Sequence, residues 1–163
     1  MATPTYVPLG TYTVTGSAAA SVTFSSIPAG YRDLILISDC KNINGNDYNL
    51  HCRINGDTGN NNPSVIMQGS SSGATSFTRN VNGAAQIGWT NSTNNSAIVT
   101  QFLDYSQTDK HKSILSRNNT EAARVTAHAI RWENTAAINS LQIFVEASGS
   151  IAIGSTFSLY GVN

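Results

Sequence analysis

The chain has 163 residues, and its nine Lys and Arg side chains are balanced by nine Asp and Glu, so the formal net charge at pH 7 is zero. Phosphate-rich partners need clustered Lys and Arg, so this balance argues against nucleic acid as a partner and against an anionic membrane surface. Charged residues make up only 11% of the chain. Ser, Thr, Asn and Gly supply the remaining polarity, and this mix favours strands and turns over helices.

The first ten residues, MATPTYVPLG, lack the basic start and apolar run of a signal peptide. No segment has the length of a transmembrane helix. We therefore expect the chain to be made and folded in the cytoplasm, or to leave it by a route other than a cleaved signal. Two prolines near the start disfavour a helix, so we expect residues 1–9 to form an extended arm and residues 10–163 to form one domain. The arm is either loose or lies on a neighbouring subunit. Its candidate contact residues are Pro4, Tyr6, Val7 and Pro8.

Two segments carry the clearest strand patterns. Residues 32–38, RDLILIS, are apolar at consecutive positions, which predicts a central strand covered on both faces. Residues 47–54, DYNLHCRI, alternate instead, and we expect Leu50 and Cys52 to point inward and His51 outward.

The C-terminal region predicts a closing hairpin. Leu141, Ile143 and Val145 share one face of its first strand, and a Ser-Gly-Ser turn follows at residues 148–150. Along the whole chain, about ten to twelve short strands alternate with turn signals. This spacing predicts an all-β, single-domain antiparallel β-sandwich, jelly-roll-like, with two four-stranded sheets and extra strands. Residues 118–123 are the one segment with helical potential, and it is too short to change this prediction.

Two cysteines are present, Cys40 and Cys52. If residues 32–40 and 47–54 paired as a hairpin, the two thiols would not face each other. We therefore expect buried free thiols and no disulfide.

The sequence contains no set of residues with metal-ligand spacing. His51, His111 and His128 are far apart, whereas a zinc site needs three or four converging ligands. The oxygen-rich segments 42–47 and 55–62 each contain one Asp and no Glu, which favours turns over calcium loops. We therefore expect hydrogen-bonded or solvated histidines, no metal and no cofactor.

Candidate catalytic residues are equally scarce. Asp104 lies at the end of an apolar segment and is a candidate buried acid, but no second carboxylate accompanies it. Structural hydrogen bonding at a strand end is the preferred interpretation. No nucleophile motif is present, so we predict that the protein is not an enzyme.

Two tryptophans are candidates for a sugar-binding platform. Trp89 shares its predicted face with Ile87, which favours the core, while Trp132 lies on a strand whose faces mix polar and apolar residues. Packing in the core or in an interface is favoured for both. A water-exposed Trp132 or Trp89 would instead support a carbohydrate-binding β-sandwich module that recognises cell-surface glycan.

Four stretches of the sequence resemble small virion proteins of tailed bacteriophages, especially cyanobacterial and marine phages. These stretches are TYVPLGTYTVTGSAAASVTFSSIPAGYRDLILI, RINGDTGNNN, DYSQTDKHKSILSRNN and WENTAAINSLQIFVEASGSIAIGSTFSLYGV. The likeness covers most of the chain and includes no catalytic signature.

The resemblance implies a structural role in the virion, with two alternatives for its location. One is a capsid decoration or cement protein that binds the outer capsid surface as a homotrimer and stabilises the head, with the major capsid protein as its partner. The other is a tail fibre or receptor-binding head domain. The sequence has no long shaft or coiled coil of the kind that a fibre needs, which favours decoration.

Overall fold

The computed structural model describes residues 4–81, 83–120 and 124–163, and within these residues it contains twelve strands and no helix. Accordingly, the described residues include no helix long and apolar enough to span a membrane. The strands are β1 (Tyr6–Thr13), β2 (Ser21–Phe24), β3 (Asp33–Cys40), β4 (Tyr48–Ile54), β5 (Pro63–Ser70), β6 (Gly73–Asn80), β7 (Ala85–Thr90), β8 (Ser96–Leu103), β9 (Lys112–Thr120), β10 (Arg124–Trp132), β11 (Leu141–Val145) and β12 (Thr156–Val162).

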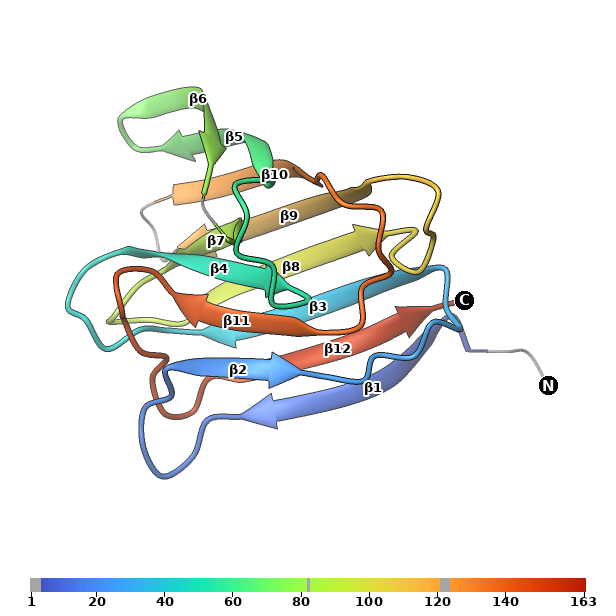
Figure 1. Cartoon of the computed structure of the whole chain (residues 1–163). Helices are drawn as coiled ribbons and strands as arrows, with labels where there is room; N and C mark the ends of the chain where they lie inside the picture. The colour runs from blue at the N-terminus through green and yellow to red at the C-terminus, as the bar shows by residue number, and fades with distance from the viewer. Residues whose placement is uncertain (1–3, 82, 121–123) are drawn as a thin grey trace.

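The strands form two antiparallel sheets packed face to face (Figure 1). The large sheet has the order β1-β12-β3-β8-β9-β10-β5-β6, and the small sheet has the order β2-β11-β4-β7. The strands β1-β12-β3-β8 and β2-β11-β4-β7 make two matching four-stranded units, and the chain passes from one sheet to the other after β1, β2, β3, β4, β6, β7, β10 and β11. This is the connectivity of a jelly roll. The predicted fold class is therefore confirmed.

The four additional strands all extend one edge of the large sheet. The hairpins β5–β6 and β9–β10 are inserted after β4 and after β8, and they pair with each other through β5 and β10. As a result the large sheet extends beyond the small sheet, and Figure 1 shows the β5–β6 hairpin at the top of the molecule.

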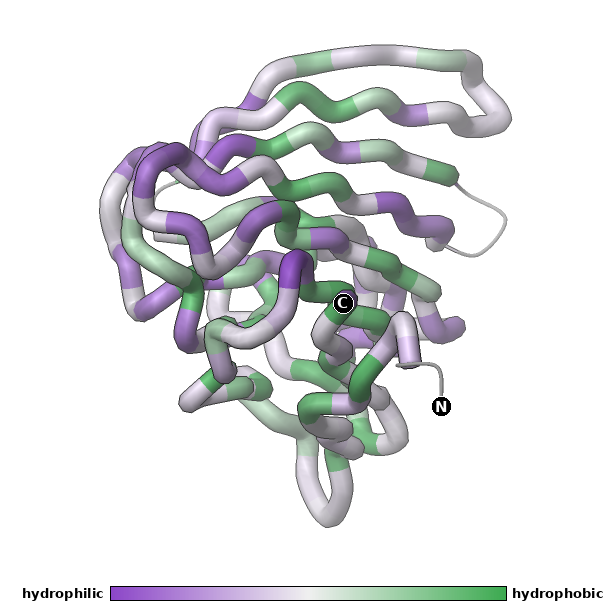
Figure 2. The backbone as a smooth tube through the Cα atoms, turned by 90° about the vertical axis from the view of Figure 1, so that its right-hand side faces the viewer, coloured by the Kyte–Doolittle hydropathy of each residue, from purple (hydrophilic) through white to green (hydrophobic). Residues whose placement is uncertain are grey.

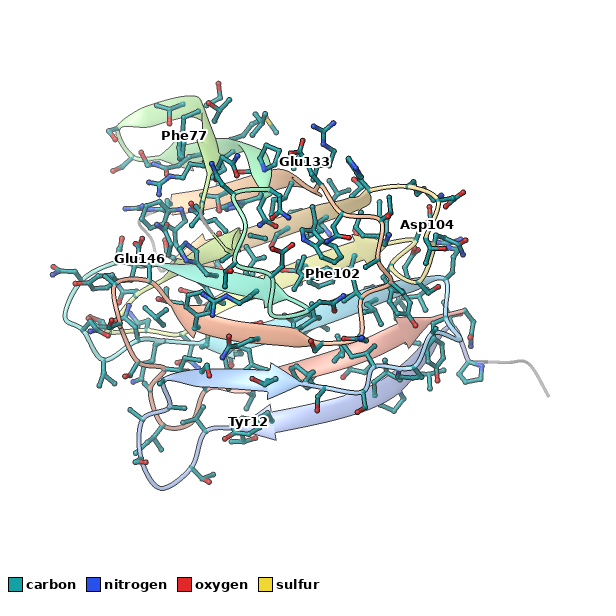
Figure 3. All side chains as sticks on the ribbon, viewed as in Figure 1. Tyr12, Phe77, Phe102, Asp104, Glu133 and Glu146 are labelled. Carbon is teal, nitrogen blue, oxygen red and sulfur yellow. The ribbon has the colours of Figure 1, made fainter. Side chains whose placement is uncertain are left out.

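The core lies between the sheets and consists of alternate residues from each strand. Leu36, Phe102 and Ile114 are fully buried on the inner face of the large sheet, and Leu50 and Ile143 come from the small sheet. Figure 3 shows Phe102 in the interior between the two sheets. Fully burying one such side chain stabilises the fold by about 1.5–3 kcal/mol.

Cys40 and Cys52 are buried free thiols, as predicted, but for a different reason. The expected hairpin does not form, because Cys40 ends β3 in the large sheet and Cys52 lies on β4 in the small sheet. Burial raises the pKa of the Cys52 thiol to about 12, and burial likewise raises the pKa of the Cys40 thiol, with the charge of Asp39 adding to the effect.

The arm predicted for residues 1–9 is wrong from Tyr6 onward, while residues 1–3 lie outside the described residues. Tyr6 and Val7 belong to β1, where they pair with Val162 and Gly161 of β12. Pro8 is compatible with this strand because β1 is at the edge of the sheet and because Pro8 coincides with a register shift, while Pro4 precedes the strand.

Two predicted exposures also differ from the structure. Leu50 and Cys52 point inward and His51 lies on the opposite face of β4, as expected. His51 is nevertheless buried, and Phe144 packs against it with ring centroids 5.5 Å apart. The strand within residues 32–38 is central in its sheet, yet Ile37 is 44% exposed because nothing covers its outer side within the described residues. Of residues 118–123, the first three extend β9 and the rest lie outside the described residues.

Candidate functional site

The outer face of the large sheet, which points away from the small sheet, carries an unusual amount of exposed apolar surface. Strand pairing places Met67, Ala127, Arg117, Val99 and Ile37 in one row across five neighbouring strands. Several large apolar side chains on this face are exposed, namely Ile37, Val65, Met67, Leu115 and Val125. Figure 2 shows hydrophobic stretches lying beside one another in the strands at the top of the molecule. Apolar surface gathered on one face is typical of a binding surface.

This face is hollowed into a trough across β8, β9, β10, β5 and β6. Its largest cavity has a volume of about 930 Å³, and two further cavities continue from it along β10. Small side chains form the floor. The apolar and small residues of the trough are Val65, Met67, Gly69, Ala74, Ala97, Val99, Leu115, Val125, Ala127 and Ala129. From Val125 to Arg131 the trough follows β10 for about 20 Å.

The charged side chains that line the trough are all positive among the described residues. Arginines line it at three positions, and among the described residues no Asp or Glu does. Arg117 projects from the middle of the face and makes no hydrogen bond or ion pair within the described part of the chain. Arg131, farther along, is paired with Glu133. In a chain with no net charge, this surface is locally positive.

Beneath the trough, the inner face of the same strands is polar and buried. The hydroxyls of Thr100 and Ser116 lie 2.8 Å apart, and Ser116 Oγ donates to the carbonyl of Ile87 at 2.5 Å. Gly88 permits this close approach of β7, because a Cβ there would lie 2.9 Å from Ile98 Cδ1. These bonds fix β7 against β8 and β9, so the trough has a rigid base.

Two histidines lie buried in or near this polar layer. Thr126 Oγ1 is 2.9 Å from His128 Nε2, and burial lowers the pKa of His128 to about 4. Burial also lowers the pKa of His51 to about 4, with opposing contributions from Glu146, which raises it, and from Arg79 and Arg53, which lower it. Both imidazoles are therefore neutral at neutral pH.

The hypothesis that Trp132 forms a sugar-binding platform is wrong. Its side chain is only 1% exposed, and its Nε1 donates to Asp57 Oδ2 at 2.9 Å, so the ring is a core residue. Trp89 is half-buried, but the guanidinium of Arg124 lies 4.4 Å from its ring centroid and is held there by an ion pair with Asp47 at 3.0 Å. One face of the Trp89 ring is therefore occupied by a side chain of the protein.

The remaining polar candidates form local structure. Asp104 follows β8 and is paired with Lys110 at 2.8 Å, which lowers the pKa of its carboxyl; Figure 3 shows it at the end of the molecule beyond β8. Asp57 accepts hydrogen bonds from Asn61, Gly59 and Trp132, which together lower the pKa of its carboxyl. Within the described residues, no three His, Cys, Asp or Glu side chains gather as a metal site would require.

Pro4, Tyr6, Val7 and Pro8 are placed by the structure at one end of the β1 edge. Tyr6 is 57% exposed and Val7 is half-buried, while Pro4 accepts a hydrogen bond at its carbonyl from Asn163 Nδ2 at 2.8 Å. They lie across the sheet from the trough, because β1 and β6 are its opposite edges. The structure therefore does not bring these residues and the trough together.

Sequence reasoning missed the trough. On β10, Val125, Ala127 and Ala129 point outward, while Thr126 and His128 are buried. The usual rule of apolar residues inside and polar residues outside does not decide the orientation, because Ile130 and Trp132 share the buried face with these polar residues. The alternation of residues 124–132 indicated a strand with two distinct faces, but alternation alone does not say which face is buried.

Comparison with known proteins adds little on function. No family model matches the chain, and no curated protein matches it. Among solved structures, a mutant of the alginate lyase Aly36B in complex with alginate tetrasaccharide has 10% identity and a TM-score of 0.38, covering 98% of this chain and 97% of that one. A further structure of Aly36B has 9% identity, a TM-score of 0.35 and coverages of 93% and 77%.

A human SPRY domain has 12% identity, a TM-score of 0.27 and coverages of 93% and 96%. Likeness this distant does not show an enzymatic activity. The fold assignment rests on the strand pairing of the chain itself.

Proposed function

We propose that this protein is a structural component of a tailed-phage virion, specifically a decoration protein that binds the outer capsid surface and stabilises the head. The observation that carries the proposal is the trough. It is a broad apolar surface on a rigid sheet, and the described residues gather no acid–base pair or metal ligands within it. Such a surface suits protein docking better than catalysis. The resemblance of the sequence to phage virion proteins supports the same role.

The trough is the proposed contact with the major capsid protein. A standard protein interface buries about 800 Å² on each partner, and the outer face spans eight strands. Strands in a sheet are spaced about 4.8 Å apart, so even the five strands of the trough, followed for about 20 Å, offer about half of that area. Ile37 on β3, beside Val99, extends the apolar surface further.

The edge strand β1 is the proposed contact between copies in a homotrimer. Its outer edge is unpaired within the described residues, and Tyr6 and Tyr12 are exposed along it. Unpaired edges pair readily with another chain. Analytical ultracentrifugation tests this part directly: a trimer mass is expected, and a monomer at all concentrations contradicts it.

A carbohydrate-binding module is less well supported. Of its two candidate platform residues, Trp132 is buried and Trp89 is stacked with Arg124. The trough itself is lined by no aromatic side chain among the described residues, whereas sugar platforms depend on exposed aromatic rings.

Immunogold labelling of intact phage particles, with an antibody to this chain, tests the location. Label distributed over the head is the expected result and supports decoration. Label confined to the tail tip would overturn decoration in favour of a receptor-binding role, and label on neither would overturn the virion assignment. A phage from which the chain has been deleted should yield heads that rupture at lower temperature than wild-type heads.

A further inference from the structure

We propose that the trough binds an extended segment of a partner protein in which apolar side chains are flanked by carboxylates. This inference rests on the proposed function, in which the segment belongs to the capsid protein, but it specifies the chemistry that the trough recognises.

The apolar part of the segment follows from the shape of the floor. Ala129 is small and lies between the larger side chains of Val65 and Leu115, so the face offers a low point bordered by apolar walls. Ala127 forms a second low point, between Met67 and Arg117. Val65 is 50% exposed and Leu115 is 41% exposed. Covering them with apolar side chains removes this surface from water, at about 25 cal/mol for each Å².

The extended conformation follows from the repeat of β10. Its outward residues Val125, Ala127 and Ala129 recur every second position, which is about 6.7 Å in a strand. An extended segment lying along β10 has the same repeat, so its alternate side chains stay in register with the floor. A helix has a pitch of 5.4 Å and falls out of register within two turns.

The carboxylates follow from the charge of the trough. Arg117 is exposed in the middle of the face and has no partner within the described part of the chain, and no described Asp or Glu lines the trough. Arg117 pairs with Ala127 across the sheet, and Arg131 lies four residues farther along β10. The backbone positions of the two arginines are therefore offset by about 13 Å along the trough, which matches two acidic residues four positions apart in an extended segment. A carboxylate at the second position would share Arg131 with Glu133.

The test uses the purified full chain and three synthetic nonapeptides that carry a fluorophore. The first has glutamates at positions 3 and 7, leucine at position 5 and valine at positions 1 and 9, so that all five side chains face the trough in an extended conformation. The second replaces both glutamates by glutamine, and the third replaces them by lysine. Fluorescence anisotropy measures affinity. Labelling with [¹³C-methyl]methionine locates binding, because Met67 lies in the trough and Met1 is the only other methionine.

The expected result is binding of the glutamate peptide about tenfold tighter than the glutamine peptide, no measurable binding of the lysine peptide, and a shift of the Met67 methyl signal. Arg117→Glu should weaken the glutamate peptide about tenfold or more, since like charges then oppose each other. Arg32→Gln is the matched control, because Arg32 is an exposed arginine that lines none of the trough cavities, and it should leave the affinity unchanged.

Failure of the glutamate peptide to bind, equal binding of the glutamine peptide, or full affinity in Arg117→Glu would each overturn the inference. These outcomes are separable from the fate of the proposed function. Heads that bind the wild-type protein and Arg117→Glu equally well would retain decoration and remove the trough as its contact. Peptide binding through Arg117 without any binding to heads would retain the trough as a peptide-binding site and remove decoration as the function.

Discussion

Mild acid should destabilise this protein through its two buried histidines. In the unfolded chain an imidazole has a pKa near 6.5, whereas burial lowers the pKa of both His51 and His128 to about 4. The folded state therefore binds fewer protons than the unfolded state at any pH between these values. The stability due to the neutral histidines is fully present above pH 6.5 and is lost as the pH falls toward 4.

The magnitude follows from the same values. A pKa difference of about 2.5 corresponds to about 3 kcal/mol for each histidine, at about 1.36 kcal/mol per pH unit. Both side chains are almost completely inaccessible to solvent, at 6% and 2% exposure, so screening by water reduces this little. Together, the stability lost when both histidines become protonated is a large part of the 5–15 kcal/mol that stabilises a typical domain.

Urea unfolding followed by tryptophan fluorescence, at pH values from 4 to 8, measures the effect. The unfolding free energy of the wild type should fall steeply below pH 6.5, and His128→Gln should reduce that slope by about half, whatever it does to stability at pH 7. His111→Gln is the control, because His111 is exposed. An unfolding free energy that stays constant between pH 6.5 and 4 would refute the reasoning. The carboxyls of Asp57 and Asp104 have lowered pKa values, so their contribution is lost only below about pH 4.

Three further outcomes are expected. Trp132→Phe should lower the unfolding free energy by about 1–3 kcal/mol, because Asp57 loses the hydrogen bond from Nε1; urea titration measures this, and an unchanged midpoint would count against the bond. Both thiols should resist a disulfide reagent at pH 8 until urea is added, since they are buried and the pKa of Cys52 is about 12; rapid labelling of the folded protein would contradict their burial. Deleting residues 1–9 should lower Tm by about 5 °C or more, because β12 loses part of its β1 partner; a truncated protein with wild-type Tm would restore the arm hypothesis.

The fold could be read from the sequence because its strands are short, alternate in polarity and are separated by strong turn residues. Leu50, Cys52 and the apolar residues of Leu141–Val145 fell on their predicted faces. The predicted closing hairpin is wrong, because β11 belongs to the small sheet and β12 belongs to the large sheet. The division into eight and four strands could not be predicted, since hairpins β5–β6 and β9–β10 have the same local pattern whichever sheet they join. Register and sheet membership depend on contacts between residues distant in sequence.

The candidate site was harder to predict, because its inner and outer faces reverse the usual polarity. Ser116, Asn118 and Thr126 are buried because they hydrogen-bond to one another or to β7, and an unbonded polar group there would be costly. The sequence gives no sign of those partners. With the polar set inside, Leu115 and Val125 are left on the outer face, and the trough is the consequence.

The pairing of β1 with β12 has a consequence for how the protein is made. Tyr6 lies beside Val162 in the finished sheet, so β1 leaves the ribosome long before its partner strand β12 is made. At about 5–20 residues per second this delay lasts on the order of ten seconds. During that interval β3 also lacks one neighbour, so it presents an open edge together with the exposed side chain of Ile37. A nascent chain in this condition depends on chaperones or on rapid completion, and a stop codon anywhere before β12 should produce aggregates rather than a shortened domain.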